Sequence, residues 1–463
     1  MKGTDFTRDY LDFLKYCRTE RDVIQYAARL LNDTGDIKYE TRSGRGLVAV
    51  RRTGRTEPVR IIGAHVDSPR IDLKMNPLYA KDGLAYLDTH YYGGIKKYQW
   101  CTIPLGLAGV VYRPGDEGYV TRHVIRMGLP EWPGVPSAAK TSDRVFCIND
   151  LLPHLSRKRM EKPAREILEG EDMDVVAAIR PPWIDKKTDA NLPDDKCGAL
   201  AEAVTKLNMM LGISPSAGDF ASSELSLVPA IDPAPVGLDG QMVGGYGQDD
   251  RSCAFAAIHA FIDSVKLKDG RNNTVLVLTD KEEIGSEGVT GAQCDWYYNT
   301  MLRLTGFDGQ GVTIGGFDVP SGFPVDIRMI SADVTAAYDP IFEDEQCERT
   351  AAKIGDGIAI SKYTGSGGKY DASDASPEYV AAIRGLLDEA KVSYQFDEMG
   401  KVDAGGGGTI AMYFARRGID VIDAGIPLLN MHSPFEIAAF RDIYSAYEAY
   451  TAFYSNKMQD FNR

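Results

Sequence analysis

Basic residues and long apolar runs are scarce in these 463 residues, and each shortage excludes a class of protein. Lys and Arg number 52 against 66 Asp and Glu, so the formal net charge is −14. A nucleic-acid-binding surface needs a basic stripe, so nucleic acid is not an expected partner. No window approaches the roughly 18 uninterrupted apolar residues of a membrane span, so we expect no membrane insertion.

Cysteine is sparse and scattered. The seven cysteines form no CxxC pair, and they stand at Cys17, Cys101, Cys147, Cys197, Cys253, Cys294 and Cys347. An odd, unclustered set is typical of reduced thiols and argues against a cysteine-built zinc site. The first 22 residues are charged and lack the apolar core of a signal peptide. We therefore expect a cytoplasmic protein in which any metal is held by His, Asp and Glu.

The apolar residues that are present predict an α/β fold. Strand-like, β-branched runs at about 58–64, 275–279 and 325–332 are apolar along their length, as in strands covered on both faces of a parallel sheet. Helical spacing is found from about 5 to 32 and in the C-terminal segment from about 434 to 457. We predict a mixed, mostly parallel central sheet flanked by helices.

The stretch from about 91 to 235 has a different character. Its short strand-like pieces are separated by turns rich in proline and glycine, and two loop signals at 214–218 and 231–235 mark its end. The chain is also too long for one ordinary core. We predict a β-rich domain, 91–235, inserted into an α/β domain made of 1–90 and 236–463.

A pair of glutamates ends the central strand, in the stretch NTVLVLTDKEEIGS of residues 273–286. Ligands bind at the carboxyl ends of strands in open α/β sheets. Glu282 and Glu283 can there divide labour, one binding a metal and the other moving protons. Since a bare pair of glutamates is also typical of a solvated turn, the rest of the chain decides between the two interpretations.

Further metal-binding residue types stand at other strand ends and at a helix start. His65 and Asp67 lie two positions apart, so both side chains point to one face of an extended segment, and the carboxylate can orient the imidazole. Taken alone, His65 and Asp67 are equally interpreted as a structural histidine that hydrogen-bonds to a nearby aspartate. Asp249 is equally interpreted as a helix cap. The candidates in chain order are His65, Asp249, Glu282, Glu283, Asp333 and His432.

This order suits a two-metal hydrolase. Two histidines and three carboxylates, one of them bridging, suffice for two zinc ions and a shared water, and manganese or cobalt also suits such ligands. Two metals about 3.5–4 Å apart lower the pKa of the bridging water and polarise a carbonyl. Glu282 then remains to take the proton of the water and pass it to the leaving amine. Glycosidase chemistry fails, because adjacent glutamates cannot flank a sugar from two sides.

The sequence resembles the aspartyl aminopeptidase and vacuolar aminopeptidase I family of co-catalytic zinc exopeptidases over essentially its whole length. Matching segments are GAHVDSP, THYYGG, QDDRSCAFAAIHA, EEIGS, SADV and LNMHSPFEI. The resemblance implies a cis peptide bond between Asp249 and Asp250. It also implies that Asp249 is the bridging ligand, that His65 and Asp333 complete one zinc site, and that Glu283 and His432 complete the other. By the same resemblance, Glu282 is the general base and Asp67 supports His65.

The resemblance extends to substrates and assembly. It implies a zinc-exopeptidase-like catalytic domain that acts on peptides, and an inserted domain that mediates dimerisation. Family members form dodecamers, built from dimers, that enclose their active sites. His154 lies in the insert and can matter to catalysis only across a subunit boundary.

Departures from the family pattern bear on specificity. After the metal-binding aspartate, aspartyl members typically carry DMAHAVHP, whereas residues 333–340 read DVTAAYDP and place Asp339 there. After the two glycines at 93 and 94, aspartyl members usually carry a charged, WFDRDL-like segment, whereas residues 100–105 read WCTIPL and lack those charges. If the first loop borders the substrate pocket, desolvating like charges together costs roughly several kcal/mol. We therefore predict that neutral or basic N-terminal residues are accepted.

Two alternatives and one further substrate contact stay open. Lys369 and Tyr370 fall in a region that contributes to substrate binding in relatives, although a glycine-rich surface loop is an equal interpretation. A related metal-dependent dipeptidase or deacylase would not release free N-terminal residues from longer peptides. A shell-forming homologue without catalysis would not bind zinc stoichiometrically.

Overall fold

The computed structural model of the protein describes residues 3–54, 57–115, 118–133, 143–184, 198–211, 217–266, 272–306, 311–314, 317–320, 326–403 and 405–455. Two compact units make up the chain. The first comprises Met1–Ser68, Pro233–Met431 and Phe435–Arg463, and the second Pro69–Asp232 with His432–Pro434. Among the described residues, no helix combines the length and the apolar character needed to cross a bilayer.

An eight-stranded mixed sheet forms the centre of the first unit, in the order β1-β2-β12-β3-β15-β19-β17-β18. The parallel pairs are β12 with β3, β3 with β15, β15 with β19 and β17 with β18. This confirms the predicted mixed, mostly parallel sheet. The strands are β1 (Lys38–Arg42), β2 (Gly46–Arg51), β3 (Val59–His65), β12 (Asn273–Thr279), β15 (Ile327–Ser331), β17 (Ile358–Ser361), β18 (Tyr394–Asp397) and β19 (Asp420–Gly425).

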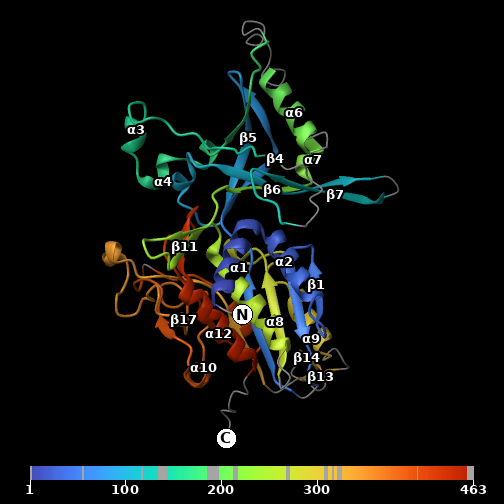
Figure 1. Ribbon diagram of the computed structural model, residues 1–463, viewed down its shortest axis with the longest axis vertical. Coiled ribbons are helices and arrows are strands. Elements are labelled where there is room, and N and C mark those ends of the chain that lie inside the picture. Colours follow the sequence, from blue (N-terminus) through green and yellow to red (C-terminus); the bar gives the residue numbers. More distant parts are fainter. Residues whose placement is uncertain are drawn as a thin grey trace. The chain divides into compact units, whose positions relative to one another are not determined.

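Helices cover both faces of this sheet. Every second side chain of β12 and β3 lies on one face of the sheet, and these side chains, such as Val275, Val277 and Ile61, pack with residues of α9 and α11 in one apolar cluster. Helices α8 and α12 lie side by side and α8 contacts β3 and β12 (Figure 1). The helices of this unit are α1 (Gly3–Tyr16), α2 (Glu20–Asn32), α8 (Gln248–Lys266), α9 (Asp295–Thr305), α10 (Pro377–Ala390), α11 (Ala411–Ala415) and α12 (Phe440–Ser455).

Smaller elements complete the first unit. Strand β11 pairs antiparallel with both β10 and β21. The short strands are β10 (Ala234–Val236), β11 (Met242–Gly245), β13 (Gly311–Ile314), β14 (Phe317–Pro320), β16 (Thr335–Ala336), β20 (Pro427–Leu428) and β21 (Glu436–Ala439), and the 3-10 helices are η5 (Glu282–Ile284) and η6 (Pro340–Glu345).

The N-terminal segment forms two helices where one was predicted from about 5 to 32. Thr19 caps α2: its side chain accepts the N–H of Asp22, and the Asp22 carboxylate accepts the Thr19 N–H at 2.9 Å. This reciprocal capping satisfies two amides at the start of α2, so the chain leaves α1 at Tyr16 and begins again at Glu20. The helical spacing predicted to end at about 32 agrees with α2, whose C-cap is Asp33.

The second unit is built on a six-stranded sheet in the order β7-β6-β9-β4-β5-β8. It starts at Pro69, earlier than the residue 91 expected from composition, because β4 and β5 pair with β9 and β8 in this sheet. Its elements are β4 (Arg70–Lys81), β5 (Leu84–Tyr92), η1 (Lys97–Trp100), β6 (Leu105–Pro114), β7 (Val120–Met127), α3 (Arg157–Met160), α4 (Ala164–Ile167), η3 (Gly170–Asp172), β8 (Val175–Ile179), α6 (Gly198–Leu211), α7 (Ala217–Ala221) and β9 (Ser223–Pro229).

We expect one buried histidine of the first unit to make the stability of the protein depend on pH. His259 of α8 is buried against Phe255, and its Nε2 lies 2.8 Å from the hydroxyl of Tyr26. Burial lowers the pKa of His259 from 6.5 to about 4. The unfolded chain therefore binds the proton first as pH falls, so the stabilisation is complete above pH 6.5 and is lost between pH 6.5 and 4, by about 3 kcal/mol in all.

We expect His259→Gln to remove this dependence. Denaturant unfolding of the wild type and the variant at pH 7.5 and 5 measures it. The wild type should lose more stability between the two pH values than the variant does. Equal losses would show that folding does not lower the pKa of His259.

Candidate metal centre

The parallel register of three strands brings the candidate ligands to one edge of the central sheet. Thr279 at the end of β12 lies opposite His65 at the end of β3, and Ser331 at the end of β15 lies opposite Gly63. The residues directly after these strands therefore emerge at the same carboxyl edge. This is where ligands bind in open α/β sheets.

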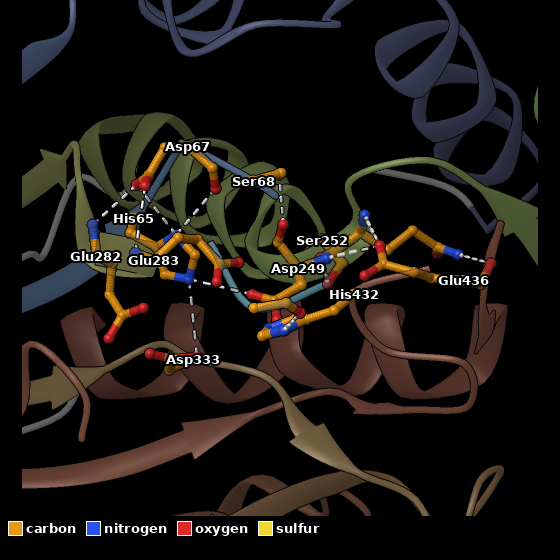
Figure 2. A network of polar contacts seen from close by, with 12 residues as sticks. His65, Asp67, Ser68, Asp249, Ser252, Glu282, Glu283, Asp333, His432 and Glu436 are labelled. Carbon is orange, nitrogen blue, oxygen red and sulfur yellow. Dashed lines mark hydrogen bonds and ion pairs between the residues drawn. The ribbon is translucent and has the colours of Figure 1, made fainter. Parts of the chain in front are cut away.

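His65, Asp249 and Asp333 form the first group of donors. One ligand atom of each lies within 4.8 Å of the others. Nε2 of His65 is 3.1 Å from Oδ1 of Asp249 and 3.9 Å from Oδ1 of Asp333. Figure 2 shows the imidazole facing both carboxylates.

Asp249, Glu283 and His432 form a second group with the same spacing, within 4.8 Å. His432 lies on a loop closed at its base by two backbone hydrogen bonds of 2.9 Å between Leu429 and Ile437. Asp249 belongs to both groups. Its peptide bond to Asp250 is cis, as the family resemblance implied.

Asp67 supports both a histidine and the glutamate turn. Its Oδ1 lies 3.4 Å from Nδ1 of His65, and the same nitrogen is 3.0 Å from the Asp67 carbonyl. With Nδ1 carrying the proton, Nε2 is left as the donor to a metal. The Asp67 carboxylate also accepts the N–H groups of Glu282 at 3.1 Å and Glu283 at 3.3 Å. The sequence predicted that Asp67 supports His65, but not its contacts with Glu282 and Glu283.

The turn that carries the two glutamates is tight. Lys281 has φ +68, in the left-handed region, and its carbonyl accepts the N–H of Ser286 at 2.7 Å. The backbone nitrogen of Glu282 faces Asp67 while its carboxylate points the other way (Figure 2). The turn thus fixes the main chain of Glu282 and leaves its carboxylate at the edge of the site.

Carboxylates crowd this buried site. Burial raises the pKa of Asp333 well above its usual range; the charge of His65 opposes this, and the charges of Asp250, Glu282 and Asp249 add to it. Burial lowers the pKa of His65, yet its hydrogen bonds to Asp249 and Asp67 outweigh that effect and raise the pKa well above normal. Oxygen and imidazole donors with an excess of negative charge are the set that zinc binds, so these residues fit the metal.

The residues predicted for substrate binding lie on loops of the first unit and have local partners. The Asp339 side chain caps η6 by accepting the N–H of Ile341 at 2.9 Å. Nζ of Lys369 lies 3.6 Å from the ring centre of Tyr363 and 3.5 Å from Asp374. Tyr370 is 72% exposed. Their part in substrate binding stays a prediction.

The glycine run at 405–408 approaches another loop of the protein. Gly406 has φ +111, and a Cβ there would lie 2.6 Å from the Gly365 carbonyl oxygen. The N–H of Gly407 donates to the Thr364 carbonyl at 2.9 Å. The contact that requires glycine at 406 is therefore with the loop at 364–366.

Two side chains that the sequence patterns did not point to hold the peptide of Asp249. Ser68 donates its hydroxyl to the Asp249 carbonyl at 2.5 Å. Glu436 accepts the Asp249 N–H at 3.2 Å (Figure 2). The segment LNMHSPFEI contains Glu436, but only the fold shows what it contacts.

An α/β sheet with histidine and carboxylate side chains at its carboxyl edge is an arrangement typical of metal-dependent hydrolases. The family model described as Aminopeptidase I zinc metalloprotease (M18) matches residues 25–454. The chain belongs to this family.

Individual relatives agree with the family. A probable M18 family aminopeptidase 1 from Clostridium acetobutylicum is 36% identical, over 96% of this chain and 94% of the relative. The crystal structure of an M18 aminopeptidase from Thermotoga maritima has a TM-score of 0.84 and is 35% identical, covering 98% of this chain and 96% of that one. The structure of an S. cerevisiae mApe1 dodecamer is 19% identical, covers 97% and 96% of the two chains, and has a TM-score of 0.72, a likeness in fold.

Proposed function

We propose that this chain is a dinuclear zinc aminopeptidase that hydrolyses the N-terminal peptide bond of peptides. The observation that carries the proposal is the shared ligand: Asp249 belongs to both donor groups, so one carboxylate can bridge two metals. The other ligands are His65 and Asp333 for one metal and Glu283 and His432 for the other. Manganese or cobalt suits the same donors.

The remaining residues act on protons and orientation. Bound zinc supplies Lewis acidity and lowers the pKa of the attacking water. Glu282, whose main chain is fixed by Asp67, takes the proton of this water and returns it to the leaving amine. Asp67 also holds the proton on Nδ1 of His65, which keeps Nε2 directed at the metal.

We propose, as part of this function, that neutral or basic N-terminal residues are accepted. Asp339 retains its carboxylate on the loop that follows Asp333, where it caps η6. A negative charge there repels an acidic side chain as both lose water. The competing function, a dipeptidase or deacylase, differs in product rather than in site.

Metal content and product analysis test the proposed function together. The purified protein should contain two metal ions per chain and release free N-terminal residues from peptides of five or more residues. With Asp-, Leu- and Lys-anilides, the Leu and Lys compounds should react faster. Absence of stoichiometric metal would favour a non-catalytic homologue, and cleavage of dipeptides alone would favour a dipeptidase. A strong preference for Asp would end the specificity proposal only.

Assembly and location complete the proposal. We infer from the family resemblance that the second unit mediates dimerisation and that the chain forms homo-oligomers built from such dimers, up to a dodecamer. The S. cerevisiae mApe1 structure is a dodecamer of its own protein. A cytoplasmic location is proposed on the cysteine pattern.

A further inference from the structure

The main chain of Asp249 is held at both the N–H and the carbonyl, on either side of its Cα. Ser68 donates to the Asp249 carbonyl at 2.5 Å, and Oε2 of Glu436 accepts the Asp249 N–H at 3.2 Å. The same oxygen accepts the N–H of Gln248 at 2.6 Å. Glu436 is 1% exposed, so these hydrogen bonds are made away from solvent.

The backbone of Glu436 is itself held in place. Its backbone lies in β21 opposite Gly245 of β11, the strand that leads into α8. Nε2 of Gln248 donates to the Glu436 carbonyl at 2.7 Å and to the Val243 carbonyl at 3.1 Å. The hydroxyl of Tyr10 donates to Oε1 of Gln248 at 2.9 Å. A strand pairing and a buried glutamine thus fix the main chain that carries the Glu436 carboxylate.

A purely structural role for Glu436 is the first alternative. The first amides of a helix have no partner within the helix, and a carboxylate there is favoured by the helix dipole. Glu436 would then act as a cap for α8 contributed by a distant strand. Loss of such a cap costs stability by an amount unrelated to metal affinity.

Two features favour a role in the metal centre. The residue held is common to both donor groups, so a small displacement of its main chain changes both groups together. Glu436 also lies four residues after His432, so the segment that carries one ligand holds the backbone of another. Ligand geometry has to be kept within about 0.5 Å for a functional site.

We propose that Glu436 is a positioning residue of the metal centre, which orients Asp249 through the N–H groups of Gln248 and Asp249. The inference rests on the proposed two-metal function. We expect the length of the Glu436 side chain to matter and its charge not to, because its oxygen has to accept two backbone hydrogen bonds. Reach and charge can be separated by two substitutions.

Glu436→Gln keeps the length of the side chain and an oxygen with two lone pairs, whereas Glu436→Asp keeps the charge and is shorter by one methylene. We expect Glu436→Gln to bind zinc within a few-fold of the wild type. We expect Glu436→Asp to bind zinc about 10–100-fold more weakly, as loss of a residue that supports a ligand does. Because its general base is intact, the activity of Glu436→Asp should recover at saturating zinc, in kcat with KM unchanged.

Asp442→Ala is the matched control. Asp442 is fully buried, and its carboxylate likewise accepts two backbone N–H groups, from Gly355 at 2.6 Å and Gly357 at 2.8 Å. Neither of these glycines adjoins a proposed ligand. The control should unfold at a lower denaturant concentration and bind zinc as the wild type does.

Zinc titration of the full-length apoproteins against a competing chelator measures these affinities, with circular dichroism to confirm folding. Wild-type affinity in folded Glu436→Asp overturns the inference, as does equal weakening in Asp442→Ala. The reverse order, with Glu436→Gln weak and Glu436→Asp normal, assigns Glu436 a charge role and also overturns it. If the wild type binds no zinc, the proposed function fails and the inference with it; two zinc ions in the wild type and in Glu436→Asp, equally tight, overturn the inference alone.

Discussion

Glu282→Gln is expected to abolish peptide hydrolysis while both metal ions stay bound. The side chain of Glu282 belongs to neither donor group, and its backbone N–H is the group held by Asp67. An amide keeps that main-chain contact and the size of the side chain but cannot take a proton from water. Loss of general-base catalysis costs about 10²–10⁴-fold in rate, which is roughly 3–5 kcal/mol of barrier.

The measurement is kcat on a Leu-anilide together with metal content by mass spectrometry, for Glu282→Gln and Glu283→Gln in parallel. Glu283→Gln is the natural comparison, because it changes the adjacent side chain and belongs to one donor group. We expect Glu283→Gln to lose one metal and Glu282→Gln to lose none. A Glu282→Gln variant that retains more than about a tenth of the wild-type kcat would assign the base to another residue.

The strand ends that carry the candidate ligands were predictable because their signal is local. The β-branched runs before His65, Glu282 and Asp333 predict buried strands, and parallel strands in register bring the residues at their carboxyl ends to one edge. The hydrophobic pattern therefore specifies both the strands and the place where the ligands meet. The family resemblance then assigned a role to each ligand.

Features set by pairing between distant segments were not predictable from one sequence. The partners of Glu436 lie 188 and 187 residues earlier in the chain, and no local pattern signals that distance. The second unit begins at Pro69 because β4 pairs with β9, some 150 residues later. The break at Thr19 was missed for a different reason: the apolar spacing continues across it, and only the capping box shows where α2 begins.

Asp249→Ala is expected to remove both metals, whereas Asp333→Ala removes one. Asp249 is the only residue shared by the two donor groups among the described residues, and Asp333 belongs to the first alone. Removing a ligand should weaken binding by more than the roughly 10–100-fold caused by loss of a supporting residue. Hydrolysis in Asp249→Ala should therefore fall to background at micromolar zinc.

Stability gives an independent measure of the same difference. A ligand that binds only the folded state stabilises it in proportion to the logarithm of its excess over Kd, so added zinc should raise the Tm of the wild type. The zinc-free Asp249→Ala variant should be no less stable than the zinc-free wild type, because it removes a charge from a crowded group of carboxylates. Added zinc should leave its Tm unchanged. If Asp249→Ala instead keeps one tightly bound metal and the Tm increase that goes with it, Asp249 is a ligand of one ion and not a bridge between two.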